Sequence, residues 1–230
     1  MAGVVTFDLA KQTVRELNQF LHHELPKNGA TKVRILNPNG LHSIAAGLDA
    51  PVQVDVMGAA GYYLGGMNKQ AGITVHGNAG WSIAENIMSG TVRVKGCVSE
   101  CAAASGHGGL VVIEGDASSR CGISMKGVDI VVGGDVGHMS AFMAQAGRLV
   151  VCGNAGPALG DSLYEAVLYV RGKIHSLGAD ARLEPMSDDD TAQLSELLRK
   201  AGMKADPKSF KRVASAKSLY HWNVEAKQEY

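Results

Sequence analysis

The chain has 230 residues with 22 basic and 22 acidic side chains, so its formal net charge at neutral pH is zero. This balance argues against a nucleic-acid scaffold that is held by a global basic field. Hydrophobic residues make up 46% of the chain, which is enough for a sizeable core, and no apolar run reaches the length of a membrane span. The first residues lack a secretory pattern and the four cysteines are not needed as disulfides, so we expect a cytoplasmic location.

Residues 1–50 are predicted to form a cap made of one helix and one strand. Asp8 is suited to begin a helix that runs to about Leu25, with leucines recurring on one face. Residues 32–36 alternate as a strand does, and residues 41–48 would complete a degenerate first coil.

Residues 51–178 repeat with a period of nineteen. Four and two positions before each repeated glycine stand apolar, mostly β-branched residues, which is the alternation of a short strand with one inward face. The glycines on this spacing, which we call the ladder glycines, are Gly58, Gly77, Gly96, Gly115, Gly134, Gly153 and Gly172. A second glycine often follows three positions later, at Gly61, Gly80, Gly137 and Gly156.

This spacing predicts a mainly β protein, a parallel β-helix (solenoid) of about seven turns. A nineteen-residue unit cannot bury its own apolar face, whereas stacked coils can, because each strand pairs in parallel with its copy in the next coil. The glycines would turn corners, either through positive φ or by leaving room for the backbone. Leucine is too scarce here for a leucine-rich repeat, and the period is too short for a propeller. A left-handed hexapeptide helix remains an alternative. The residue before each ladder glycine should face outward.

Residues 179–230 are predicted to form a helix on the last coil and a tail that docks on a partner. Ser187 and Asp190 have the spacing of a helix-capping pair, and Gly202 is suited to end the helix. From Met203 onward the chain holds six basic and three acidic residues, a net charge of +3. A tail folded back along its own solenoid remains the alternative. The aromatic docking candidates in this tail are Phe210, Tyr220 and Trp222.

Few residue groupings in the sequence could carry out catalysis. The run Gly133–Gly137 follows a strand but lies on the glycine ladder, so it needs no bound phosphate to explain it. Cys97 and Cys101 have the wrong spacing for a common metal site, and with Cys121, a possible neighbour in space, we interpret them as buried structural thiols. His107 stands on a glycine-rich corner without an assignable nucleophile or acid partner. We therefore assign no catalytic, cofactor-binding or metal-binding residue to this chain.

Four glycine-rich stretches share one pattern on the nineteen-residue period, at residues 58–68, 84–90, 105–117 and 153–161. Together with the period, they resemble the GXGXG domain at the C-terminus of the glutamate synthase large subunit, over about residues 30–180. A chain of this length with its own helical N-terminus is similar to the separate glutamate-synthase-like subunit of three-part complexes, above all N-methylglutamate synthase (methylamine–glutamate N-methyltransferase).

The resemblance implies a right-handed solenoid and a scaffold subunit with no catalytic residues of its own. It implies two partners, a glutamine-amidotransferase-like subunit and an FMN-binding subunit that would hold the FMN and any iron–sulfur cluster. The whole complex would convert methylamine and L-glutamate to N-methyl-L-glutamate and ammonia. The open alternatives are a three-part glutamate synthase, the C subunit of formylmethanofuran dehydrogenase, and, from a different class, a stand-alone acyltransferase that uses His107.

Overall fold

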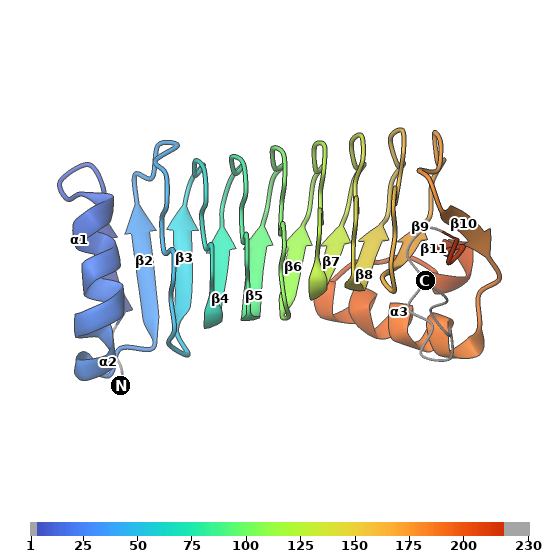
Figure 1. Cartoon of the computed structure of the whole chain (residues 1–230). Coiled ribbons are helices and arrows are strands. Elements are labelled where there is room, and N and C mark those ends of the chain that lie inside the picture. The colour runs from blue at the N-terminus through green and yellow to red at the C-terminus, as the bar shows by residue number, and fades with distance from the viewer. Residues whose placement is uncertain (1–3, 219–230) are drawn as a thin grey trace, which may run out of the picture.

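The computed structural model describes residues 4–218, whose strands are stacked in a long row (Figure 1). All eleven strands belong to one sheet, in the order β1-β2-β3-β4-β5-β6-β7-β8-β9-β11-β10. The chain is thus a mainly β solenoid of about seven parallel coils, as predicted. The parallel strands of the coils are β2 (Lys32–Leu36), β3 (Gln53–Met57), β4 (Lys69–Val75), β5 (Ser89–Val94), β6 (Leu110–Ile113), β7 (Lys126–Val132), β8 (Ala146–Val151) and β9 (Val167–Val170).

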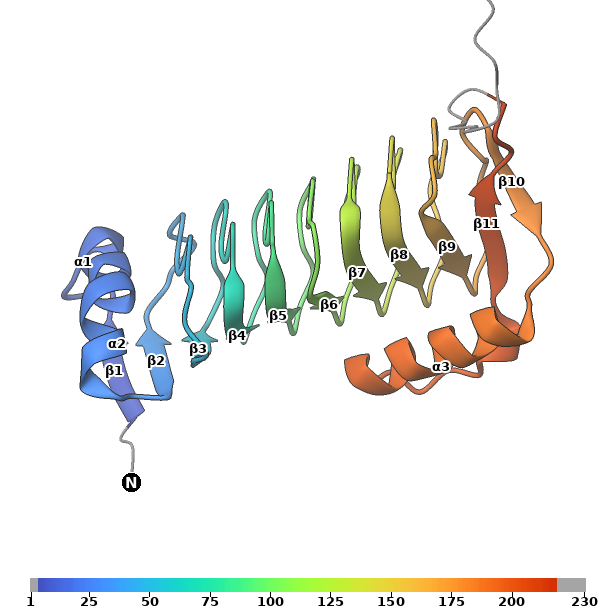
Figure 2. The ribbon, with the colours of Figure 1, turned by 60° about the horizontal axis from the view of Figure 1, so that its bottom comes forward.

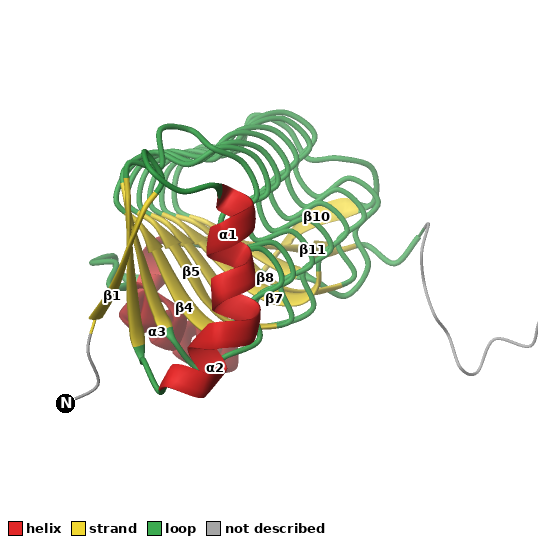
Figure 3. Cartoon of the chain, turned by 90° about the vertical axis from the view of Figure 1, so that its left-hand side faces the viewer, coloured by secondary structure: helices red, strands yellow, loops and turns green. Residues whose placement is uncertain are grey.

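The strands pair in the register that the nineteen-residue period predicts. Val54 pairs with Ile73, Ile73 with Val92, and the same column continues to Leu168. The side chains of this column are at most 1% exposed. Viewed from the end, the loops lie over one another as regularly as the strands do (Figure 3). The main core is therefore a stack of aliphatic side chains inside the coils.

The N-terminal end begins with a strand, which the sequence analysis did not predict. β1 (Val4–Asp8) pairs in parallel with β2, so Asp8 ends a strand instead of capping a helix. The helix α1 (Val14–Gln19) begins at Thr13, whose hydroxyl accepts a hydrogen bond from the Glu16 N–H at 3.2 Å. The Glu16 carboxylate accepts the Thr13 N–H at 2.7 Å in return. This reciprocal capping box is a stronger start signal than a lone Asp.

The helix continues past α1 and closes the open end of the core. It passes through a π-helical turn (Phe20–Glu24) and α2 (Leu25–Asn28), and it ends at Gly29, whose φ is +68°. The side chains that it buries against the solenoid are Leu17, Leu21 and Leu25. Among residues 4–218, no helix is long and apolar enough to cross a membrane.

The C-terminal helix α3 (Asp188–Ala201) lies along the outer wall of the sheet, over the last coil and the coils before it (Figure 2). The end of the row is formed by β11 (Lys211–Ser215), which pairs antiparallel with β9, and by β10 (Ala181–Glu184), which pairs antiparallel with β11. A short 3-10 turn (Pro207–Ser209) leads into β11. The predicted helix is therefore present and contacts the last coil at Tyr169, but it also covers earlier coils, which was not predicted. Part of the predicted docking tail is a strand of the sheet.

A second apolar core explains where α3 lies. The outward position three residues before the ladder glycine is polar in the early coils, where it holds Asp55, Thr74 and Arg93, but apolar in the later ones. Cys152 faces outward, as predicted for the residue before a ladder glycine, and there it is buried in this second core as well. Helix α3 thus covers the stretch of wall that is apolar. The buried residues are Val112, Val131, Val150 and Tyr169 of the sheet, and Leu194, Leu197, Leu198 and Ala201 of α3.

Phe210 is part of this second core and is not a docking residue. Its side chain is only 5% exposed, between the sheet and α3. An aromatic ring that is buried within its own chain cannot contact a partner, so this prediction was wrong. The other two docking candidates, Tyr220 and Trp222, lie outside the described residues.

The ladder glycines act mainly by giving room to the backbone of the preceding coil. Of the seven, Gly58 alone has a φ in the left-handed range, +147°. At Gly77, a Cβ would lie 2.8 Å from the Ala59 nitrogen and 2.8 Å from the Gly58 carbonyl carbon. Left-handed backbone occurs at other glycines just before or within the strands. Among these are Gly90, Gly109 and Gly147, with φ of +80°, +81° and +93°.

The close approach at Gly77 leads to a first prediction. Gly77→Ala should lower the free energy of unfolding by about 1–3 kcal/mol, because the new methyl group meets fixed backbone atoms and the two coils must separate. Gln145→Ala, at an exposed loop position, is the matched control and should change stability by less than about 0.5 kcal/mol. Urea unfolding measures both. Equal midpoints for Gly77→Ala and the unmodified chain would contradict this account of the ladder.

Candidate interaction surface

The described residues hold no cluster of metal-ligating side chains. Residues 4–218 contain no group of three His, Cys, Asp or Glu side chains that could hold a metal ion. His107 is exposed, and its backbone N–H donates to the Ile87 carbonyl oxygen at 2.7 Å as part of the coil stacking. Its place in the structure is that of a corner residue, as its glycine-rich surroundings suggested.

The cysteines divide into buried and accessible thiols. Cys121 is fully buried, and burial raises the pKa of its thiol to about 12, so it stays protonated. Cys101 is half-buried and close enough to Cys121 for the two groups to interact electrostatically, so the expected proximity is confirmed. Cys97 is exposed, contrary to the prediction that all three are buried.

Cys97 belongs to a polar ladder that runs along one corner of the coils, at the position after each ladder glycine. Its N–H donates to the Asn78 Oδ1 at 2.9 Å, and its Sγ accepts the Asp116 N–H at 3.4 Å. The Asp135 N–H then donates to Asp116 Oδ1 at 2.8 Å, and the Asn154 N–H to Asp135 Oδ1 at 2.6 Å. Each side chain thus satisfies a backbone donor in the next coil, where the strand ladder has ended.

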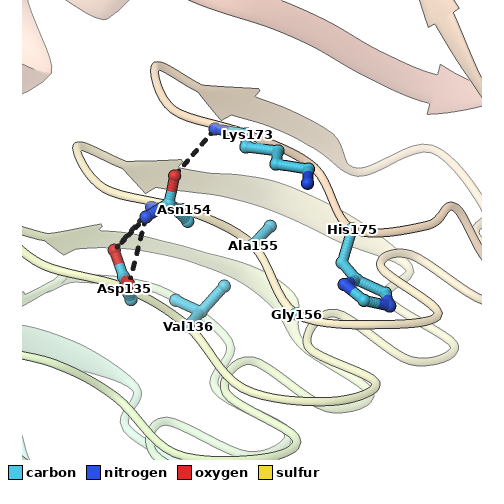
Figure 4. Close-up of a pocket in the computed structure, with 7 residues that line it drawn as sticks. All are labelled: Asp135, Val136, Asn154, Ala155, Gly156, Lys173 and His175. Carbon is cyan, nitrogen blue, oxygen red and sulfur yellow. Dashed lines mark hydrogen bonds between the residues drawn. The ribbon is translucent and has the colours of Figure 1, made fainter.

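This ladder ends at a shallow pocket of about 310 Å³ (Figure 4). The Lys173 N–H donates to Asn154 Oδ1 at 2.9 Å, while the side chains of Lys173 and His175 extend over the pocket. The side-chain oxygens of Asp135 and Asn154 accept hydrogen bonds from the next coil, as the dashed lines in Figure 4 show. The polar groups that line this pocket are therefore mainly structural.

A charged network fixes the start of α3 to the sheet. The Tyr169 hydroxyl donates to Asp190 Oδ1 at 2.7 Å, and the Arg212 Nε donates to the same oxygen at 3.0 Å. Ser187 donates to the other carboxylate oxygen through its N–H at 3.0 Å and its hydroxyl at 2.6 Å. Arg212 also pairs with Glu184. Burial alone would raise the pKa of Asp190, but these hydrogen bonds lower it to about 2.

The exposed aromatic side chains gather at the opposite end, on the first coils. We call His42, Tyr62, Tyr63 and Trp81 the aromatic patch. The rings of His42 and Tyr62 lie 6.2 Å apart edge to face, and those of Tyr62 and Tyr63 lie 5.5 Å apart. Trp81 is 59% exposed and Tyr62 is 46% exposed. Large aromatic side chains that remain in water at this level are a common mark of a protein interface.

The backbone under the aromatic patch is held rigidly. Residues five, seven and nine positions after the ladder glycine have left-handed φ values, which are +60°, +60° and +54° at Tyr63, Gly65 and Met67. Each such non-glycine residue costs roughly 1 kcal/mol or more. Bonds between coils hold them, from the Tyr63 N–H to the Trp81 carbonyl at 2.9 Å and from the Met67 N–H to the Glu85 carbonyl at 2.7 Å. The backbone that carries the patch is therefore fixed by bonds to the next coil.

The sequence analysis missed the aromatic patch, although a signal for it was present. Tyr62 and Trp81 both stand four positions after a ladder glycine, so they share a column in neighbouring coils. Glu100 follows them in this column, which puts a negative charge beside the patch. The tail, where aromatic and basic residues coincide, gave the stronger signal along the sequence.

Two comparisons with known proteins bear on the identity of the chain. No family model matches the sequence. One curated protein, "Protein GlxC" of Rhizobium meliloti (strain 1021), is 52% identical over 224 residues, which cover 97% of this chain and 98% of that protein. The two chains are therefore alike from one end to the other.

The Asp190 network leads to a second prediction. Asp190→Asn should lower the free energy of unfolding at neutral pH by about 2 kcal/mol, because it leaves Arg212 without one of its carboxylate partners. Since the folded-state pKa of Asp190 lies below its unfolded value, this stabilisation is complete above pH 4 and is lost as the pH falls toward 2. Urea unfolding should show that the difference in free energy of unfolding between the variant and the unmodified chain becomes smaller as the pH falls from 4 to 2.

Asp189→Asn is the matched control for this prediction. Asp189 is exposed in the same first turn of α3, so its neutral variant should change stability by less than about 0.5 kcal/mol at any pH. If the difference in free energy of unfolding between Asp190→Asn and the unmodified chain stays constant down to pH 2, the charge of the carboxylate is not the source of the stabilisation.

Proposed function

The chain belongs to the family of Protein GlxC, and from this premise we propose that it is a non-catalytic scaffold subunit of a glutamate-synthase-type enzyme complex. The observation that carries the proposal is a rigid solenoid with an exposed aromatic patch and, in residues 4–218, no cluster of metal-ligating side chains. A rod of this kind is suited to hold other subunits.

We assign the complex to N-methyl-L-glutamate synthase, which converts methylamine and L-glutamate to N-methyl-L-glutamate and ammonia. The basis for this assignment is the resemblance of residues 30–180 to the GXGXG domain, together with the similarity to GlxC over nearly the whole chain. The partners in this proposal are an amidotransferase-like subunit and an FMN-binding subunit, and the FMN and any iron–sulfur cluster reside in the latter. Both this chain and its complex are assigned to the cytoplasm.

The physical role of the chain in such a complex is to keep two active sites in register. Seven coils at a strand spacing of about 4.8 Å make a rod roughly 30 Å long. Because each coil is bonded to both neighbours, a partner bound at one coil is held at a fixed distance from a partner bound elsewhere on the rod. A fixed distance lets a nitrogen species pass between the sites without release into solvent.

The aromatic patch is the proposed contact for one partner, which gives a third prediction. The complex is isolated through a tag on this chain, and the FMN that accompanies it is measured by absorbance. The double variant Tyr62→Ala, Trp81→Ala should retain at least tenfold less FMN, because exposed aromatic residues are frequent hot spots of about 2 kcal/mol or more. Its own unfolding midpoint should stay unchanged, since both rings lie outside the core.

Met57→Ala is the matched control, because Met57 is 40% exposed but stands on the outer wall of β3, away from the patch. It should retain FMN as the unmodified chain does. Purification of the unmodified chain alone, without a flavin-containing partner, would contradict the scaffold proposal itself. Activity of the whole complex with methylamine, compared with glutamine, separates N-methylglutamate synthase from an ordinary three-part glutamate synthase.

A further inference from the structure

The two ends of the solenoid are closed in different ways. At the N-terminal end, Leu17 and Leu21 of the helix are fully buried over the core. At the C-terminal end, α3 lies along the side, so β10 is the last strand of the sheet within the described residues. Leu183 of β10 is 57% exposed there. An edge strand that carries an exposed leucine at the end of a solenoid is a surface that pairs readily with another strand.

The sequence of β10 is complementary to itself. Arg182 and Glu184 lie two residues apart and therefore on the same face of the strand, with Leu183 between them on the other face. If two copies of β10 run antiparallel about Leu183, each Arg182 stands opposite the Glu184 of the other copy. The two Leu183 side chains then stand opposite each other. Opposite charges and apolar pairs directly across two strands are both stabilising.

We propose that two copies of this chain pair end to end through β10, antiparallel and about a two-fold axis at Leu183. The eleven-stranded sheet of each copy would then continue into the sheet of the other. This is an isologous contact, in which the same surface is used on both sides, and such contacts close into a dimer and do not grow into filaments.

The contacts within one copy leave this pairing available. Glu184 is 24% exposed and is held from the inner side by Arg212, so its carboxylate keeps a fixed position. Arg182 is 57% exposed and donates to the Glu184 Oε1 of its own chain at 2.7 Å. An exposed arginine on such a pair can turn to the carboxylate across the two-fold axis at little cost, because exposed ion pairs are weak. The pairing therefore exchanges the two ion pairs within the copies for two across the interface, so the ion pairs cost nothing and the strand pairing and the Leu183 contact supply the gain.

The inference does not rest on the proposed function, and its failure is separable from the failure of that proposal. It concerns the isolated full chain, whereas the scaffold proposal is tested by retention of a flavin-containing partner. A chain that retains FMN but stays monomeric would overturn the dimer alone.

Disulfide trapping gives the sharpest test. In a Cys97→Ser background, which removes the exposed thiol, Leu183→Cys places two cysteines directly opposite each other across the axis. The distance between opposite residues in a strand pair suits a disulfide. Mild oxidation should convert most of this variant to a covalent dimer. Leu41→Cys in the same background is the control, because Leu41 is 39% exposed at the other end of the rod, and it should remain mostly monomeric.

Light scattering after size exclusion tests the non-covalent dimer. The unmodified full chain should be a dimer at high micromolar concentration, and Leu183→Asp should be a monomer with an unchanged circular dichroism spectrum. The inference is overturned if the unmodified chain is monomeric and Leu183→Cys cross-links no more than Leu41→Cys.

Discussion

The structure depends on one steric constraint, which is the close approach of successive coils at the corner that follows each strand. Parallel strands lie about 4.8 Å apart, and at Gly77 a Cβ would already lie 2.8 Å from backbone atoms of the previous coil. Glycine at this corner therefore lets each strand pair with the next in a constant register, in which every residue lies beside the residue nineteen positions later. The column of buried aliphatic residues, the polar ladder and the left-handed turns all follow from that shared register. A side chain at the corner would separate the coils and weaken all three together.

The features that the sequence predicted well are those that each repeat specifies by itself. The alternation around Val54 and the glycine that follows define a strand and a corner within a few residues, so the coil and its register could be derived. The predictions that were wrong concern places where two segments compete to form different structures. Asp8 looked suited to start a helix, but the apolar residues of β1 pair with β2, and the capping box at Thr13 starts the helix later. The capping residues alone did not show that a strand precedes the helix in the chain.

The position of α3 could be predicted only after the register was known. The outward column that includes Val112, Val131 and Val150 is apolar, but these residues are nineteen apart and form a surface only when the coils stack. Once they do, an amphipathic helix is needed to cover them, and Phe210 is drawn into the same core. The aromatic patch has the same origin, since Tyr62 and Trp81 become neighbours only through the register. A tally of aromatic residues along the chain points to the tail instead.

The coverage of the wall also decides where the rod can meet other molecules. Helix α3 covers the apolar wall of the later coils. Two surfaces with exposed apolar side chains remain toward the two ends, which are the aromatic patch on the first coils and the edge of β10. These surfaces are separated by several strands at about 4.8 Å each, or roughly 30 Å. At that distance, a molecule bound at the edge of β10 does not obstruct the aromatic patch. A dimer through β10 would therefore leave both aromatic patches free, far from the two-fold axis, and could carry two sets of partner subunits at once.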